Sequence, residues 1–139
     1  MSTHYHLLVG TPQGNLSSGM RELNGCYARY YNRRHQSTGA VFESRFRSEL
    51  VESDSHLVQA IRYLAMNPVR AGLCSRAEHW PWSSLPGHLG ITPMRRFVQA
   101  APLLELFASD PNVARSRLRR FIADSVPTVS DTVPVSDTG

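Results

Sequence analysis

The sequence predicts an α+β domain, because short extended segments and amphipathic helical segments alternate along its first seventy residues. Residues 4–9 form a short apolar run that ends in the turn-rich GTPQGN, as a strand followed by a loop does. Residues 42–51 show a broken alternation of polar and apolar side chains, typical of a second strand or hairpin arm. Between and after these segments, apolar residues recur every three or four positions, which favours helices.

The predicted helices begin at residues that commonly cap helices. The first follows Asn15, and its apolar face consists of Leu16, Met20, Leu23, Tyr27 and Tyr30. The second follows Ser53 or Asp54, and its apolar face consists of Leu57, Ile61, Leu64 and Ala65. We expect Pro68 to end it near Asn67, because the residue before a proline avoids the helical region. Further on, PLLELF predicts a short helix and VARSRLRRFI a basic amphipathic one.

Charge separates the body of the chain from its end. All 15 basic residues are arginines that precede Ala123, whereas three of the 11 acidic residues follow it, so the body carries a net charge of +7. A basic body of this size favours a polyanionic partner, most often nucleic acid. We expect one domain over residues 1–124 and a disordered tail over residues 125–139, which have no hydrophobic period. No apolar run is long enough for a signal peptide or a membrane span.

Two histidines, His4 and His6, lie one residue apart in the first predicted strand. Residues i and i+2 of a strand share a face and lie about 6.6 Å apart, so two imidazoles there can converge on one divalent ion. Two ligands do not complete a site. A pair of this kind in an arbitrary protein more often reflects surface or core polarity than metal binding.

Tyrosines indicate what such an ion would do, because a tyrosine that attacks a phosphodiester must lie beside the ion that polarises the phosphate. A helical residue four positions on shares the face of the tyrosine. The pairs with this spacing are Tyr27–Tyr31, Tyr30–Arg34, Tyr31–His35 and Tyr63–Asn67. The amide oxygen of Asn67 can join two imidazoles around Mg²⁺ or Mn²⁺. On spacing alone, a half-buried helical tyrosine and a helix cap explain Tyr63 and Asn67 better.

Four segments in order resemble a known family. They are HYHLLVGTPQGNLSSGMRELNGCYARYYNRRH, GAVFESRFRSELVES, RYLAMNPVRAGL and HWPWSS. The HxH pair, the arginine-rich NGxYxRYxNRRH helix, FxxRF and YxxxNPVRAGL together resemble the REP-associated tyrosine transposases, which are single-tyrosine HUH nucleases. The resemblance covers residues 2–84.

The resemblance implies a ferredoxin-like antiparallel sheet with helices on one face, whose first β–α unit is missing because Met1 falls inside it. It implies that Tyr63 is the catalytic nucleophile and that His4, His6 and Asn67 hold Mg²⁺ or Mn²⁺. The expected substrate is single-stranded DNA at hairpin-flanked sites, cleaved to a 5′-phosphotyrosine bond and a free 3′-hydroxyl during DNA transposition. We expect a monomer or homodimer in the bacterial cytoplasm, associated with the nucleoid.

Further DNA contacts are expected from two groups of arginines, Arg29, Arg33 and Arg34 on the first helix and Arg45 and Arg47 on one strand face. Two alternatives remain open. One is a non-catalytic DNA-binding remnant that keeps the arginine surface, and the other is a small structural protein with an incidental histidine pair.

The two tryptophans and the four other histidines are assigned no function. We expect Trp80 and Trp82, which flank a proline, to clamp onto the core rather than to stack on bases. The histidines without ligand spacing are expected at the surface: His35, His56, His79 and His88.

Overall fold

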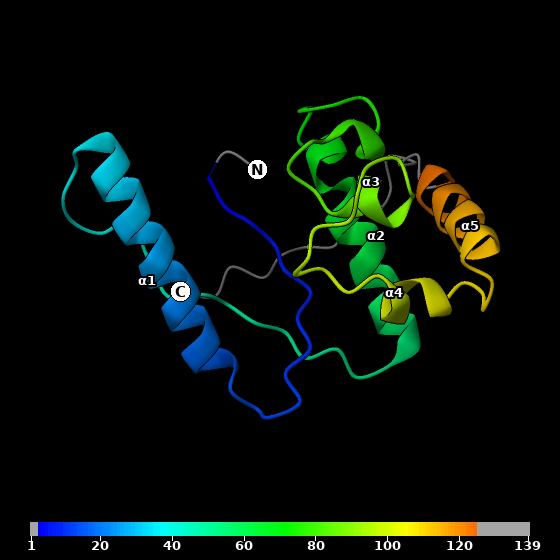
Figure 1. Ribbon diagram of the computed structural model, residues 1–139, viewed down its shortest axis with the longest axis horizontal. Helices are drawn as coiled ribbons and strands as arrows, with labels where there is room; N and C mark the ends of the chain where they lie inside the picture. Colours follow the sequence, from blue (N-terminus) through cyan, green and yellow to red (C-terminus); the bar gives the residue numbers. More distant parts are fainter. Residues whose placement is uncertain (1–2, 125–139) are drawn as a thin grey trace. The chain divides into compact units, whose positions relative to one another are not determined.

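The computed structural model describes residues 3–124, which divide into two compact units (Figure 1). One unit comprises residues 8–51. The other comprises residues 3–7 together with 52–124. The predicted disordered tail, residues 125–139, lies outside the described residues.

The unit of residues 8–51 is built on one helix, α1 (Leu16–His35), with Asn15 at its N-cap as predicted, although the Asn15 side chain makes no capping hydrogen bond. The helix ends at Gln36, whose φ of 50° is left-handed. Asn32 holds the chain that follows, because its Nδ2 donates to the Gly39 carbonyl oxygen (3.0 Å) and its Oδ1 accepts from the Ser37 hydroxyl (3.1 Å). Met20 is the buried residue of α1.

The other unit is built on α2 (Asp54–Arg70), which begins at Ser53 as predicted. The Ser53 hydroxyl accepts a hydrogen bond from the backbone N–H of His56 (3.2 Å). Contrary to the prediction, Pro68 does not end the helix, which continues to Arg70. A proline lacks an N–H to donate, but the last turn of α2 still forms beyond it: the N–H of Ala71 donates to the Asn67 carbonyl (3.0 Å).

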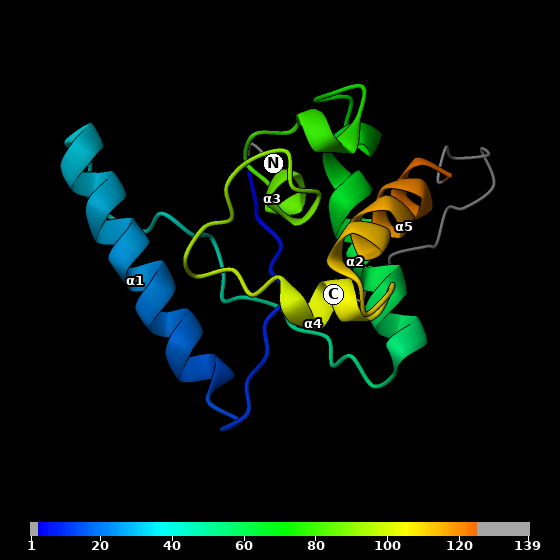
Figure 2. The same ribbon diagram turned by 45° about the vertical axis from the view of Figure 1, so that its right-hand side comes forward.

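The remaining helices pack against α2 or against one another (Figure 2). They are the 3₁₀ turn η1 (Ala77–His79), α3 (Leu85–His88), α4 (Ala101–Glu105) and α5 (Pro111–Ala123). The η1 turn and α5 contact α2, α3 contacts η1, and α4 contacts α5. Helices α4 and α5 confirm the two predicted C-terminal helices, and Asp110 caps α5 by accepting from two backbone N–H groups at 2.9 Å. Apolar residues at every fourth position of α5 lie in the core, where Ala114 and Leu118 are fully buried in one cluster with Ile61.

The predicted ferredoxin-like antiparallel sheet is wrong: within residues 3–124 the structure contains helices and no strand. Residues 4–9 and 42–51, the two predicted strands, are irregular chain with mostly exposed side chains. Alternation of polar and apolar side chains is a pattern within one segment. A strand is stable only when a neighbouring strand pairs with its backbone N–H and C=O groups. Neither segment finds such a neighbour in the described chain, so the local pattern did not determine the structure.

Two smaller predictions are also wrong. Trp82 does not pack on the core, because 81% of its surface is exposed, whereas Trp80 is half-buried. His88 is not a surface residue, because it is buried in α3 with 5% exposure. None of the helices in residues 3–124 is long and apolar enough to cross a membrane.

Candidate active site

Helix α2 presents its tyrosine because its opposite face is fixed in the core. Ile61, Ala65 and Met66 are buried. Tyr63 follows Ile61 by two residues, which is about 200° around a helix of 3.6 residues per turn, and its side chain is 46% exposed. Arg70 lies seven residues, or about two turns, beyond Tyr63 and therefore on the same outer face. Its guanidinium carbon is 5.8 Å from the centre of the Tyr63 ring.

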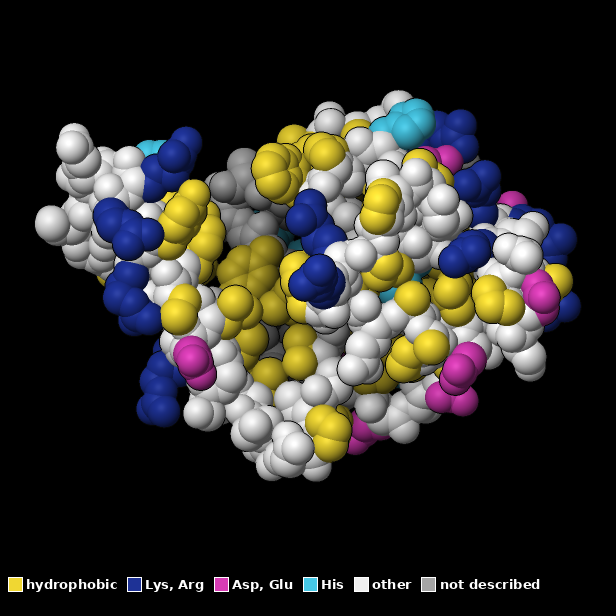
Figure 3. All heavy atoms as spheres, viewed as in Figure 1, with side chains coloured by type: hydrophobic (Ala, Val, Ile, Leu, Met, Phe, Trp, Pro, Cys, Tyr) yellow, Lys and Arg dark blue, Asp and Glu magenta, His cyan; other side chains and the backbone are white. Residues whose placement is uncertain are grey.

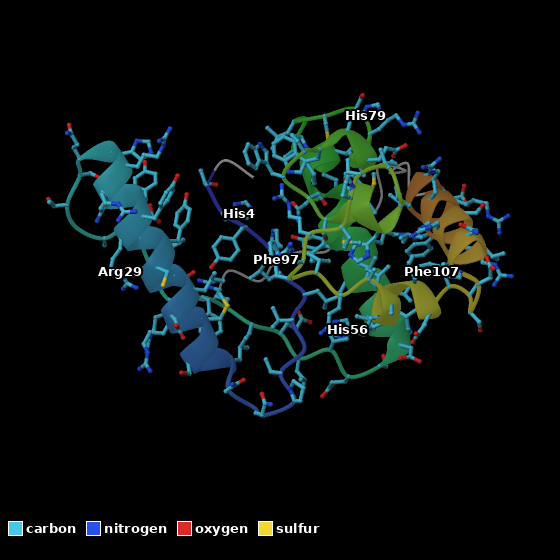
Figure 4. All side chains as sticks on the ribbon, in the orientation of Figure 1. His4, Arg29, His56, His79, Phe97 and Phe107 are labelled. Carbon is cyan, nitrogen blue, oxygen red and sulfur yellow. The ribbon has the colours of Figure 1, made fainter. Side chains whose placement is uncertain are left out.

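One predicted metal-ligand histidine, His6, lies beside this tyrosine, and the other, His4, lies beside His6. The His6 ring meets the Tyr63 ring edge-on, with centroids 5.7 Å apart and planes at 81°. The His4 ring meets the His6 ring in the same way, with centroids 5.0 Å apart and planes at 87°. Figure 4 shows His4 on the N-terminal segment. Residues more than fifty positions apart in the chain therefore form one cluster of two imidazoles, a phenol and a guanidinium.

Each of the two imidazoles can present a ring nitrogen to a metal ion. The Nδ1 atom of His4 lies 3.1 Å from the Thr3 hydroxyl, and when Nδ1 carries the proton, Nε2 is left with a free lone pair. Burial lowers the pKa of His6 below its ordinary value, and the nearby His4 lowers that pKa further. A neutral imidazole is the form that binds a metal ion.

The third predicted ligand, Asn67, lies one turn beyond Tyr63 on α2. Its Nδ2 atom is buried and has no hydrogen-bond partner among the described residues. The oxygen and nitrogen of a side-chain amide are told apart by their hydrogen bonds, and the buried Nδ2 position of Asn67 has none. Either position can therefore be the oxygen, which is the atom that can bind a metal ion. Residues 3–124 contain no cluster of three histidine, cysteine or carboxylate side chains. The amide oxygen of Asn67 is a donor that suits Mg²⁺ or Mn²⁺, and the binding of such an ion by His4, His6 and Asn67 stays a prediction.

The predicted DNA-binding arginines belong to the unit of residues 8–51. Arg29, Arg33 and Arg34 are exposed on the second half of α1. Arg45 and Arg47 are exposed as well, but they flank the half-buried Phe46 on irregular chain rather than on the predicted strand. All five guanidiniums are therefore accessible to a polyanion, and their role in DNA binding stays a prediction.

The alternative tyrosines of α1 pair mainly with one another. The rings of Tyr27 and Tyr31 have centroids 6.1 Å apart, and Phe42 packs against Tyr27 at 5.8 Å. Tyr31 also stacks on His35 with centroids 4.3 Å apart. The Tyr31–His35 pair contains one imidazole. The cluster around Tyr63 contains the imidazole of His6, which contacts that of His4, and the guanidinium of Arg70.

Sequence reasoning missed Arg70 because it ended the helix at Asn67. The signal was present in the spacing, since position i+7 lies on the same face as Tyr63 whenever the helix continues past Pro68. A second arginine of α2, Arg62, has a structural role. Its guanidinium lies 3.9 Å from the centre of the Phe121 ring and donates to the Phe121 carbonyl oxygen (3.2 Å), which ties α2 to α5.

Comparison of the chain with protein-family models, with curated proteins and with solved structures gives no match. The case for a function therefore depends on the cluster itself and on the motifs of the sequence.

Proposed function

We propose that this chain is a metal-dependent endonuclease and strand transferase that cuts single-stranded DNA at hairpin-flanked sites through a covalent phosphotyrosine, as a transposase does. The observation that supports it most is the contact between His6 and Tyr63, with ring centroids 5.7 Å apart. A nucleophile for a phosphodiester is useful only beside the group that neutralises the phosphate, and this contact brings the two together.

The proposed step exchanges one phosphoester for another. The Tyr63 oxygen attacks phosphorus, and the bond from phosphorus to the 3′-oxygen breaks. The phenol proton leaves to water, the departing 3′-oxygen takes up a proton, and the phosphate stays bound through its 5′-oxygen. Resealing is the reverse attack by a 3′-hydroxyl, so no external energy source is required.

His4, His6 and Asn67 would hold the divalent ion, and the ion would supply positive charge to the phosphoryl oxygens. Arg70 supplies a second positive charge to the same phosphate from its position over the Tyr63 ring. The cluster is open to solvent, as a site for a polymer substrate must be: Tyr63 is 46% exposed, and His4 and Arg70 are exposed.

Covalent capture tests the proposal. A labelled single-stranded DNA hairpin incubated with the protein and Mn²⁺ is expected to give a protein–DNA adduct that survives denaturing electrophoresis. Tyr63→Phe removes the attacking oxygen and is expected to abolish the adduct while DNA binding is retained. Tyr30→Phe, which changes an exposed tyrosine of α1, is the matched control and is expected to leave the adduct intact.

An adduct that persists in Tyr63→Phe and disappears in an α1 tyrosine variant would place the nucleophile on α1. Absence of any adduct, together with tight DNA binding, supports the second candidate function, a DNA-binding protein that does not cut. One observation favours that candidate: the segment that carries His4 is exposed and is not held by a sheet. Catalysis requires ligands placed within a fraction of an ångström, whereas binding by arginines tolerates looser placement.

A further inference from the structure

A tight turn between α3 and α4 presents an aromatic ring to solvent between positive charges. The N–H of Val98 donates to the carbonyl oxygen of Arg95 (2.9 Å), which closes a β-turn with Arg96 and Phe97 at its tip. Phe97 is 82% exposed. Figure 4 labels this side chain. A phenylalanine at a turn tip gains nothing from the core, so its ring is free to contact a ligand.

The turn is anchored on both sides. Before it, the Met94 side chain packs so closely on Gly87 of α3 that a Cβ at Gly87 would lie 3.1 Å from the Met94 sulfur. After it, Ala100 packs against the core and its carbonyl accepts the first hydrogen bond of α4, from Leu104 (3.0 Å). The ring of Phe97 is therefore carried by a turn with fixed ends.

The charged residues next to Phe97 in the sequence are both arginines. Arg95 and Arg96 are exposed, and within the described chain neither guanidinium takes part in an ion pair or hydrogen bond. No acidic residue occurs between Glu78 and Glu105. A partner that meets this turn must offer an apolar or aromatic face with negative charge close to it.

We propose that the Arg95–Val98 turn is a binding site for one unpaired base of a single-stranded nucleic acid, with the base stacked on Phe97 and its flanking phosphates contacting Arg95 and Arg96. Aromatic bases and negatively charged phosphates alternate along single-stranded DNA and RNA. Because every base can stack on an aromatic ring, the site would bind strands of any sequence. A duplex keeps its bases stacked on one another and offers only phosphates. The site deepens the proposed function, since it would hold single-stranded substrate away from Tyr63.

The test compares two labelled oligonucleotides of equal length, an oligothymidylate and an abasic strand with the same phosphates. Binding is measured by fluorescence anisotropy in the presence of a chelator, so the result does not depend on whether Tyr63 cuts DNA. Phe97→Ala is expected to weaken oligothymidylate binding on the order of tenfold and to leave binding of the abasic strand unchanged. Phe97→Tyr keeps a stacking ring and is expected to bind as the wild type does.

Two matched variants control for side effects. Ile91→Ala truncates a nearby apolar side chain that is 50% exposed and cannot stack, and it is expected to change neither affinity. Arg96→Ala is expected to weaken both strands, whereas Arg76→Ala removes the same charge from an arginine already paired with Glu78 and is expected to have a smaller effect. An oligouridylate of the same length then shows which nucleic acid the site prefers.

The proposal is overturned if Phe97→Ala leaves oligothymidylate binding unchanged or weakens both strands equally. It is also overturned if sedimentation shows that the variant has lost self-association, because the turn would then be a contact between copies of this chain. These outcomes differ from failure of the proposed cleavage, which would appear as a missing adduct with Mn²⁺ while the Phe97 effect is retained.

Discussion

Helices α1 and α2 both carry tyrosines and arginines, but only α2 has one face fixed in a core. Four residues of α2 are buried, including Ile61 and Ala65, which pack with Leu118 of α5. In α1 the buried residue is Met20, and Tyr27 and Tyr30 remain about half exposed. A helix whose back is packed points its outer side chains in set directions, whereas an exposed helix offers a surface without fixing distances.

Under the proposed function, the two helices would do different work. Chemistry at a phosphodiester depends on distances, so it would take place at the face of α2 that carries Tyr63. Attraction of a polyanion depends on the number and accessibility of charges, and the exposed arginines of α1 would supply it. Arginine side chains also stand out on the surface over α5, where Arg117, Arg119 and Arg120 are exposed (Figure 3).

The largest expected effect is on the imidazole pair beside α2. The double variant His4→Ala, His6→Ala is expected to lower the rate of adduct formation with Mn²⁺ at least about a thousandfold, because a phosphoryl-bound ion supplies several kcal/mol of transition-state stabilisation. Binding of single-stranded DNA in chelator is expected to persist. His79→Ala, at an exposed histidine far along the chain, is the control. Undiminished cutting by the double variant contradicts the metal site.

The next effect concerns the packing that distinguishes the helices. Leu118 is fully buried, so Leu118→Ala is expected to lower the free energy of unfolding by about 2–5 kcal/mol through lost burial and a new cavity. Leu23 of α1 is 49% exposed, and Leu23→Ala is expected to change that free energy by less than about 0.5 kcal/mol. Urea titrations followed by circular dichroism measure both. Equal losses would show that α1 is packed as α2 is.

The sequence predicted α1, α2, α4 and α5, because their periodicity is local, but it did not predict η1 and α3. Ser53 caps α2 as predicted, by a side-chain hydrogen bond to a residue three positions on, whereas the Asn15 side chain makes no such bond. The end of α2 was missed because the proline rule describes an average helix, and here a buried Pro68 lies in the final turn. The strands were wrong because pairing is not local: residues 42–51 alternate, yet no neighbour pairs with them in the described chain.

The candidate site was predictable in part for the same reason. The HxH spacing and the YxxxN spacing are local, and motif resemblance joined His6 to Tyr63 across more than fifty residues. The contact of Arg70 with the Tyr63 ring was missed because it requires α2 to continue past Pro68. The exposure of Phe97 depends on how the α3–α4 turn is anchored, which no single window of sequence contains.

A smaller effect is expected from pH, through the buried His88 of α3. Burial lowers the pKa of His88 below its ordinary value of 6.5, and its Nδ1 has no partner among the described residues. As the pH falls below 6.5, His88 takes up a proton in the unfolded chain but resists it in the folded chain. The free energy of unfolding is therefore unaffected by His88 above this pH and decreases as the pH falls below it. The loss is a fraction of the roughly 1.4 kcal/mol per pH unit of a full proton difference.

His88→Leu is expected to flatten this pH dependence and to keep or raise stability at neutral pH, because an apolar residue leaves no unpaired nitrogen. Thermal melts between neutral pH and mild acid measure the effect, with His79→Leu as an exposed control. If the wild type loses no stability on acidification, the folded chain accepts the proton on His88 as readily as the unfolded chain does. His88 then has a hydrogen-bond partner or contact with water that the structure does not show.

The smallest effects are expected in the unit of residues 8–51, where no single side chain is decisive. If its arginines contact phosphates, the logarithm of the affinity for single-stranded DNA falls linearly with the logarithm of salt concentration, by a slope of about −0.7 for each contact. Arg33→Ala and Arg45→Ala are each expected to make the slope shallower by about that amount and to leave the rate of adduct formation at saturating DNA unchanged. Anisotropy titrations across a salt series measure the slope. If Arg33→Ala lowers the saturated rate and leaves the salt slope as it was, α1 takes part in the chemistry, and the division of work between the two helices is incorrect.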